Sequence, residues 1–320
     1  MLIAFQGETG AYSEAAGAKF DPTATFLPCP AFEDVFAAVE TGRAGCGVLP
    51  IENSIGGTIH RNYDLLVQNE LKIVGEIELP VRHLLLALPG TRFEDLKQVY
   101  SHPQALAQCD RFLRSLKGVE IVASYDTAGS AKMIREQHMS GVGAIASERA
   151  AAVFGLETLR AGIQDHEDNT TRFLIVTRAA AVDEFIGSRP VNKTTIVFTL
   201  PNTPGALFKA LSVFALREIE VTKIESRPTG RPWEYLFHLD LAVGQHELRC
   251  GRALSHLAEF APSLKSLGSY PGVARSADTA VARRPGVEGA RSTETGEAPV
   301  ECSGPSTPGG HDARVAGGVS

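Results

Sequence analysis

The first 178 residues alternate between short apolar segments and segments with a helical repeat, and this alternation limits the possible fold more than any other feature. Phe32, Val35, Phe36 and Val39 have the spacing of one helix face, and Gly42 follows as a stop signal. Strands and helices that alternate in this way predict an α/β region with a largely parallel sheet. Strands are expected at residues 2–6, 46–50, 73–79, 84–88, 119–124 and 142–146, and helices at 13–20, 32–39, near 104–116, near 128–136 and from 148.

The order of elements changes after Arg178. Residues 181–192 have no clear periodicity and contain Gly, Pro and Asn, which is typical of a linker. Residues 193–272 follow the order strand, helix, strand, strand, helix, strand, which predicts a ferredoxin-like βαββαβ domain. Residues 275–320 lack large apolar residues and are expected to be a disordered tail. The first helix of the second domain is expected to bury Phe208, Leu211, Phe214 and Ala215.

Composition and short motifs exclude several classes of protein. A net charge of −6 argues against binding to nucleic acid or to a membrane surface, and no apolar run reaches the length of about 18 residues that a membrane span needs. The five cysteines form no CxxC pair, so we predict neither a zinc site nor disulfides, and a reducing compartment fits. The N-terminal segment does not resemble a secretory signal, so a cytoplasmic location is expected. No HExxH, P-loop or dinucleotide motif is present, so no metal or cofactor is predicted.

Four hydroxyl side chains follow strand-like runs and precede helix-like ones, namely Ser13, Ser101, Thr127 and Ser147. Each suits an N-cap, where a hydroxyl accepts from free backbone N–H groups. Ligands of parallel α/β sheets collect at these same strand-to-helix junctions. The four junctions together are therefore also suited to a small ligand with several negative charges.

Two loops depart from the periodic pattern. Residues 52–57 place an acid, an amide, a hydroxyl and two glycines after a strand, and residues 168–173 place hydroxyls beside a guanidinium. Arg172 suits bidentate carboxylate binding, and an ion pair at the surface is an equally good interpretation of it. His102 precedes Pro103 at a helix start, where we favour a capping or packing role over general acid catalysis.

Several motifs, in order along the chain, resemble those of the prephenate dehydratase family. In the first region they are residues 7–13 (GETGAYS), 50–54 (PIENS), 101–104 (SHPQ) with Gln108, 126–128 (DTA), and 169–173 with the Thr171-Arg172-Phe173 signature. In the second region, residues 205–208 (GALF) and 225–228 (ESRP) match both motifs of the ACT regulatory domain. The resemblance covers roughly residues 2–272.

This resemblance implies a fold and a reaction. The catalytic region, residues 1–180, is expected to have two lobes like type II periplasmic binding proteins, with lobe one at 1–79 plus 164–180 and lobe two at 80–163. The ACT domain is expected at 193–272. Family members remove water and carbon dioxide from prephenate to give phenylpyruvate, and they need neither metal nor cofactor. They form homodimers or homotetramers and are feedback-inhibited by L-phenylalanine at the ACT domain.

The resemblance also assigns roles to individual residues. Thr171 is expected to donate a hydrogen bond to the departing ring hydroxyl, and Glu52 is expected to bond within its loop, with a second acid as the alternative. The other catalytic candidates are Arg172, Asn53, Ser101 and Gln108. The substrate-binding candidates are Ser13, Thr127, Ser147, Asn169 and Phe173. The candidates for the phenylalanine site are Asn202, Gly205, Ala206, Leu207, Phe208, Glu225, Ser226, Arg227 and Pro228.

Two other functions remain open at this point. The loop at residues 58–63 is similar to that of plant arogenate dehydratases, which act on arogenate in plastids, so arogenate is the alternative substrate and the plastid the alternative location. A non-catalytic amino-acid sensor is the alternative of another class. Because the first strand begins directly after Met1, a monofunctional enzyme without a chorismate mutase segment is expected.

Overall fold

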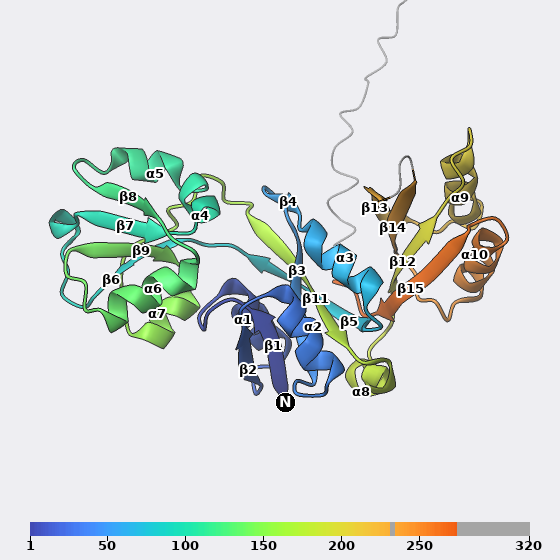
Figure 1. The fold of residues 1–320 in the computed structure, drawn as a ribbon, viewed down its shortest axis with the longest axis horizontal. Helices are drawn as coiled ribbons and strands as arrows, with labels where there is room; N and C mark the ends of the chain where they lie inside the picture. The colour runs from blue at the N-terminus through green and yellow to red at the C-terminus, as the bar shows by residue number, and fades with distance from the viewer. Residues whose placement is uncertain (231–233, 274–320) are drawn as a thin grey trace, which may run out of the picture. The chain divides into compact units, whose positions relative to one another are not determined.

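The computed structural model describes residues 1–230 and 234–273, and the tail expected at 275–320 lies outside the described residues. The described strands form three sheets (Figure 1). Within these ranges, no helix has the combination of length and apolar character that crossing a membrane requires.

The first sheet has the strand order β2-β1-β3-β11-β5, and the short β4 pairs with β3. Because β11 runs antiparallel to β3 and β5, the sheet expected to be largely parallel is mixed. Patterning missed β2, an edge strand interrupted by Pro28. The strands are β1 (Leu2–Gln6), β2 (Thr25–Cys29), β3 (Cys46–Asn53), β4 (Gly57–Thr58), β5 (Lys72–Pro80) and β11 (Thr170–Thr177). The helices around it are α1 (Tyr12–Phe20), α2 (Phe32–Glu40), α3 (His60–Gln68) and α8 (Val182–Ile186), the last within the expected linker.

The second sheet has the order β10-β6-β9-β7-β8. Its strands are β6 (Leu84–Ala87), β7 (Gln98–Ser101), β8 (Glu120–Ala123), β9 (Val142–Ala146) and β10 (Glu157–Ala161), and its helices are α4 (Pro103–Ala107), α5 (Asp110–Ser115), α6 (Thr127–Glu136) and α7 (Glu148–Phe154). The single helix expected near 104–116 is thus two helices. They separate at Gln108, whose carbonyl accepts from Asp165 N at 2.7 Å, and at Cys109, whose ψ of 22° is not helical.

The chain passes between these two sheets twice. It leaves the first sheet after β5 and returns to it in β11. The two connections lie side by side, because Val81 N donates to Asn169 O at 2.7 Å and His83 N donates to Gln164 Oε1 at 3.0 Å. The chain therefore forms two α/β lobes joined by a pair of hydrogen-bonded connections, as the family resemblance implies.

The third sheet confirms the predicted βαββαβ order and is antiparallel throughout, with the strand order β13-β14-β12-β15. Its elements are β12 (Lys193–Thr199), α9 (Ala206–Ala215), β13 (Val221–Pro228), β14 (Tyr235–Leu241), α10 (Leu248–Ala258) and β15 (Ser263–Tyr270). The stripe expected on α9 was wrong in part, since Phe208 is 75% exposed whereas Ala210, Val213 and Phe214 are buried. Almost every position of α9 is apolar, so its periodicity fits more than one face.

The third sheet packs directly on the first. Val197, Leu267 and Tyr270 belong to the same buried cluster as Tyr63 and other side chains of the first lobe. A Cβ at Gly268 would lie 2.3 Å from the carbonyl oxygen of Ile73, so glycine permits β15 to approach β5 this closely. The catalytic region and the βαββαβ domain therefore share one apolar interface.

His238 makes this interface sensitive to pH. Its ring is 2% exposed, lies 4.6 Å from the ring of Tyr63, and has no hydrogen-bond partner among the described residues. Burial lowers the pKa of His238 to about 4, although nearby carboxylates such as Glu225 oppose this effect. The folded protein therefore binds fewer protons at this site than the unfolded chain between about pH 6.5 and pH 4.

We expect the free energy of unfolding to decrease as the pH is lowered through that window. The contribution of His238 is fully present above about pH 6.5 and is lost toward pH 4, by up to about 3 kcal/mol. Urea unfolding at several pH values measures it. His238→Phe should flatten the curve, and His246→Gln, at an exposed position of the same domain, should not. Parallel curves for wild type and His238→Phe would contradict the assignment.

Candidate functional site

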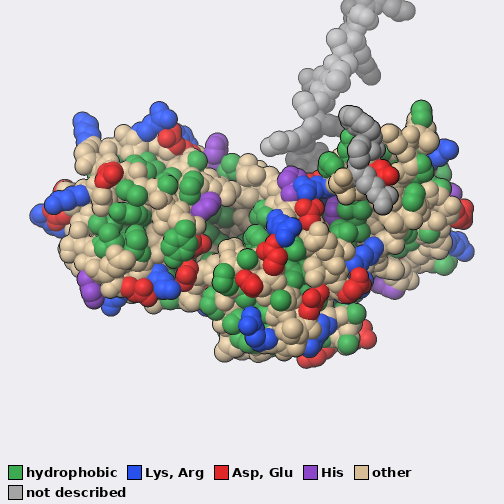
Figure 2. Space-filling view, viewed as in Figure 1, with side chains coloured by type: hydrophobic (Ala, Val, Ile, Leu, Met, Phe, Trp, Pro, Cys, Tyr) green, Lys and Arg blue, Asp and Glu red, His purple; other side chains and the backbone are tan. Residues whose placement is uncertain are grey.

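A pocket of about 280 Å³ lies where the two lobes meet, and Figure 2 shows the surface recessed between them. Six of the predicted site residues line it: Ser13, Asn53, Gln108, Thr127, Thr171 and Phe173. A larger hollow of about 830 Å³ at the edge of the second sheet is lined by none of them. We therefore place the candidate active site in the smaller pocket.

Thr171 and Asn53 face each other across neighbouring strands of the first sheet. They are register partners of β11 and β3, and Asn53 Nδ2 donates to Thr171 Oγ1 at 2.9 Å. The orientation of the Asn53 amide is fixed, because its Oδ1 accepts from the backbone N–H groups of Ile55 (3.1 Å) and Gly56 (2.7 Å). Thr171 Oγ1 is thus an acceptor from Asn53, and its own proton is free to donate into the pocket.

The same orientation propagates through a chain of amides. Asn53 Nδ2 also donates to Asn169 Oδ1 at 2.7 Å, so Asn169 Nδ2 donates onward to Gln108 Oε1 at 3.0 Å. Gln108 Oε1 lies 2.8 Å from His83 Nε2, which must then carry a proton. The Nε2 group of Gln108 is left to donate to a ligand, since Gln108 lines the pocket.

His83 and Tyr12 end this chain. The Tyr12 hydroxyl lies 3.1 Å from His83 Nδ1 and donates to the Arg82 carbonyl at 2.7 Å. Burial lowers the pKa of His83, more than its bond to Gln108 raises it, so the ring is neutral. Burial also raises the pKa of Tyr12 far above its ordinary value, which keeps the phenol protonated.

Three helices begin at the pocket. Tyr12 and Ser13 are the first residues of α1, and His102 caps α4 by accepting from Gln104 N at 3.2 Å, as expected. Asp126 caps α6 by accepting from Gly129 N at 2.7 Å, and burial raises the pKa of its carboxyl group. The pocket lining therefore combines helix N-termini with amides and hydroxyls, and it includes no Lys or Arg.

Two predicted hydroxyls do not line the pocket. Ser101 is fully buried and donates to Ile145 O at 2.7 Å. Ser147 caps α7, accepting from Ala150 N at 3.0 Å and donating to Gly10 O at 2.6 Å. The sequence allowed Ser147 to be either a helix cap or a ligand contact, and the structure shows it as a helix cap. Asn169 likewise lies behind the pocket, between Asn53 and Gln108.

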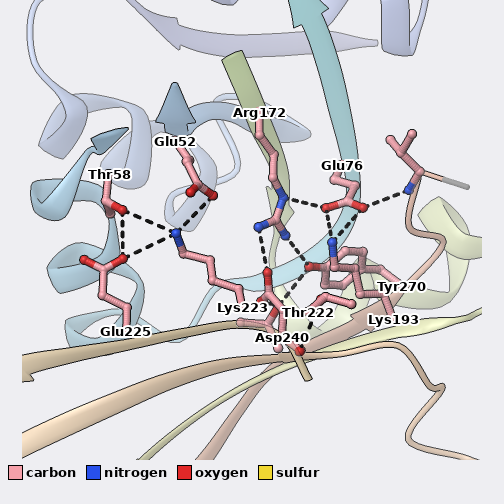
Figure 3. A network of polar contacts seen from close by, with 12 residues as sticks. Glu52, Thr58, Glu76, Arg172, Lys193, Thr222, Lys223, Glu225, Asp240 and Tyr270 are labelled. Carbon is pink, nitrogen blue, oxygen red and sulfur yellow. Dashed lines mark hydrogen bonds and ion pairs between the residues drawn. The ribbon is translucent and has the colours of Figure 1, made fainter. Parts of the chain in front are cut away.

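Arg172 and Glu52 point away from the pocket, toward the third sheet (Figure 3). Arg172 bonds Glu76 at 2.7 Å and Asp240 at 2.6 Å, and Glu52 pairs with Lys223 at 3.0 Å. The reason is the two-residue period of a strand, since each residue follows or precedes one that faces the pocket. In this arrangement Arg172 does not reach the pocket to bind a substrate carboxylate, and Glu52 does not reach it to act as an acid. The ion pairs of Arg172 are buried and do not lie at the surface.

The candidate phenylalanine residues occupy two places. Asn202 precedes α9, Gly205 has a φ of +78° at its start, and Leu207 and Phe208 are exposed. In β13 the side chains of Glu225 and Arg227 contact the first lobe, where Glu225 bonds Thr58 and Arg227 pairs with Asp64. The remaining candidates are Ala206 on α9, and Ser226 and Pro228 on β13.

The sequence pattern did not single out four residues that line the pocket, namely Tyr12, His83, Tyr125 and Asp126. One signal was available for His83, which lies where the chain was expected to cross between the lobes. Nothing in the periodicity indicated that its ring would turn inward.

The family model described as prephenate dehydratase matches residues 3–181, and the ACT domain model matches residues 194–245. Arogenate dehydratase/prephenate dehydratase 2, chloroplastic, from Arabidopsis thaliana is 48% identical over 279 residues, which are 84% of this chain and 72% of the relative. Arogenate dehydratase 2 from Petunia hybrida is 48% identical over 286 residues, 85% of this chain and 72% of the relative.

Two solved structures resemble the chain along most of its length. Prephenate dehydratase from Arthrobacter aurescens in complex with L-Phe has 33% identity and a TM-score of 0.76, over 84% of this chain and 89% of that one. A structure described as a novel type of quorum quenching acylase has 38% identity and a TM-score of 0.78, over 85% and 98%.

The family models assign the two α/β lobes to a dehydratase catalytic region and the ferredoxin-like domain to an ACT regulatory domain. The chain belongs to the prephenate dehydratase family, and it is a hydro-lyase of the prephenate and arogenate dehydratase type. The predictions of family, fold class and enzyme class are confirmed.

Proposed function

We propose that the pocket between the lobes converts prephenate to phenylpyruvate, with Thr171 as the group that assists departure of the ring hydroxyl. The observation that carries this proposal is the hydrogen bond from Asn53 Nδ2 to Thr171 Oγ1, which leaves the Thr171 proton available to a ligand. A threonine hydroxyl is a weak acid, so its role is to donate a hydrogen bond to charge that develops on the leaving oxygen.

The reaction breaks two bonds of the substrate ring. The bond to the ring carboxylate breaks and its electron pair enters the ring, while the ring C–O bond breaks and the hydroxyl leaves as water with a proton that ultimately comes from solvent. Carbon dioxide, water and phenylpyruvate are the products. Because the ring becomes aromatic, modest assistance to the leaving group suffices.

The lack of Lys and Arg in the pocket lining suits this chemistry. The departing carboxylate loses its charge during the reaction, so a strong cation beside it would stabilise the substrate more than the transition state. Gln108 Nε2, Thr171 and the N-termini of α1 and α6 supply partial positive charge without a full cation. Ser13, Thr127 and Phe173 complete the proposed substrate-binding surface.

The direct test is turnover by the purified chain. Formation of phenylpyruvate from prephenate is expected, and it should slow when phenylalanine is added. Amide hydrolysis, the activity named for one structural neighbour, is assayed in the same preparation. Absence of dehydratase activity on both prephenate and arogenate would contradict the proposal.

Arogenate is the second candidate substrate, and Asp126 is the observation that favours it. Arogenate carries an ammonium group where prephenate carries a keto oxygen. Asp126 is the one Asp or Glu in the pocket lining, and the same lining has no Lys or Arg to balance a substrate with two negative charges. Several of the most similar relatives are named arogenate dehydratases.

Asp126→Asn tests which substrate the pocket prefers. Asparagine retains the cap on α6 and removes the charge, so kcat/KM for arogenate should fall about tenfold or more relative to prephenate, as expected for one charge-assisted hydrogen bond. Asp110→Asn, which removes a carboxylate paired with Arg114 outside the pocket lining, is the matched control. An unchanged ratio in Asp126→Asn would show that Asp126 does not contact the amino group.

We further propose that phenylalanine binds the ACT domain at residues 202–208 and 225–228, and that the chain self-associates through this domain. The relative solved with L-Phe supports the ligand. Exposed apolar side chains support the association, since Phe208, Ile224 and Tyr235 are 75%, 45% and 40% exposed. The four described cysteines are free and buried, which suits the reducing interior of either the cytosol or a plastid.

A further inference from the structure

The two strands that carry Asn53 and Thr171 present their alternate residues to the ACT domain. Asn53 pairs with Thr171 and Glu52 pairs with Arg172 in the register of β3 and β11. Neighbouring residues of a strand point to opposite faces, so the first pair faces the pocket. The second pair faces the third sheet (Figure 3).

Arg172 enters a buried cluster of four charges. It bonds Glu76 on β5 and Asp240 on β14, and Lys193 on β12 bonds Glu76 at 2.8 Å. These four side chains are 2–15% exposed. Tyr270 contributes its hydroxyl, 3.2 Å from Arg172 Nη2. Arg172 and Glu76 belong to the first sheet, whereas Asp240, Lys193 and Tyr270 belong to the third. The cluster therefore bridges the catalytic strand and the ACT sheet.

Glu52 makes a second bridge of the same kind. Lys223 on β13 pairs with Glu52 at 3.0 Å and with Glu225 at 3.4 Å, and Glu225 accepts from Thr58 Oγ1 at 2.8 Å. Thr58 is in turn the register partner of Glu52 on β4. The loop that orients Asn53 through its backbone N–H groups therefore lies between two residues held by β13.

We propose that Arg172 and Glu52 are positioning residues, through which the ACT domain sets the geometry of Thr171 and Asn53. A shift of β13 or β14 when an amino acid binds the ACT domain would be transmitted to the pocket across one peptide unit of each strand. This coupling changes the rate of catalysis only if the amino acid binds two conformations of the protein with different affinity. This proposal rests on the proposed function.

The alternative is that Arg172 binds a substrate carboxylate. The two roles predict different kinetics, because loss of a substrate ligand raises KM, whereas displacement of Thr171 lowers kcat. They also differ at Asp240, which lies on β14 of the ACT domain and is joined to the catalytic strand by its ion pair with Arg172.

The experiment compares Asp240→Asn and Lys223→Met with Lys265→Met in the full chain. Lys265 is the matched control because it too joins the ACT domain to the first lobe, at Val67, Asn69 and Glu70, away from β3 and β11. Each variant is assayed for kcat, KM and the response to phenylalanine. Circular dichroism confirms folding, and Lys223→Met decides the outcome if Asp240→Asn does not fold.

We expect Asp240→Asn and Lys223→Met to lower kcat by about tenfold to 10²-fold, the effect of a misplacement of about 1 Å, with KM little changed. Their response to phenylalanine should weaken. Lys265→Met should keep the wild-type kcat and the wild-type response to phenylalanine. Lys223→Arg, which retains the positive charge that Lys223→Met removes, should keep both as well.

Three results would overturn the proposal: wild-type kcat and phenylalanine response in both test variants, a rise in KM with kcat unchanged, or an equal loss in Lys265→Met. An active wild type with any of these results would remove this proposal alone. A wild type that turns over neither substrate would remove the proposed function and this proposal with it.

Discussion

Thr171→Val is expected to lower kcat for prephenate by about 10² to 10³-fold, the usual cost of one donor that stabilises charge in a transition state. Valine keeps the β-branched shape that suits β11 but has no proton to donate. Because the contact with the leaving oxygen strengthens only as the C–O bond breaks, KM should change little. Steady-state kinetics with purified protein measures both constants.

Thr171→Ser is the matched control, since it keeps the hydroxyl that Asn53 orients. It should retain most of the wild-type kcat. Wild-type turnover by Thr171→Val would remove the hydroxyl from the mechanism, and an equal loss in both variants would assign the effect to packing instead.

Arg172→Leu is expected to reduce the free energy of unfolding by about 3–5 kcal/mol, because it leaves two buried carboxylates with Lys193 as their only cation in the cluster. Burial alone would raise the pKa of Asp240, but Arg172 and Lys193 outweigh it and hold that pKa below its ordinary value. Urea unfolding near neutral pH, where Asp240 is charged, measures the loss.

Arg92→Leu is the control for this prediction. Arg92 also pairs with a carboxylate, that of Asp95, but its side chain is 74% exposed and solvent screens the pair. Its replacement should leave stability almost unchanged. A similarly small effect for Arg172→Leu would show that the buried cluster does not hold the two domains together.

The sequence was sufficient for the parts of the fold that depend on local pattern. The βαββαβ order followed from the order of strand-like and helix-like segments. The positions of the connections near residues 80 and 164 were implied by the family resemblance and not by local pattern. Periodicity was not sufficient for α9, whose apolar residues fill every face, so Phe208 was placed inside although it is exposed. Neither did it show that Gln108 and Cys109 divide one expected helix into two.

At the site, motifs indicated which segments meet but not which way each side chain points. Thr171 and Arg172 are adjacent in one signature, and only the register of β11 against β3 and β5 sends one to the pocket and the other to the ACT domain. The tautomer of His83 depends on the orientations of three side-chain amides, the first of which is fixed by the backbone of Ile55 and Gly56. Such long-range hydrogen bonds leave no periodic trace in a sequence.

The proposed mechanism depends most on the direction of the Thr171 hydroxyl proton, which the hydrogen bond from Asn53 sets. Asn53→Asp keeps the oxygen that accepts from Ile55 and Gly56 but replaces the donor to Thr171 with an acceptor. The Thr171 proton should then turn toward Asp at position 53 and away from the substrate.

The decisive measurement is kcat for Asn53→Asp, Thr171→Val and the double variant. We predict that Asn53→Asp loses about as much activity as Thr171→Val, and that the double variant loses little more, because both changes remove the same interaction. Wild-type kcat in Asn53→Asp, or losses that multiply in the double variant, would contradict the proposed orientation of the Thr171 hydroxyl.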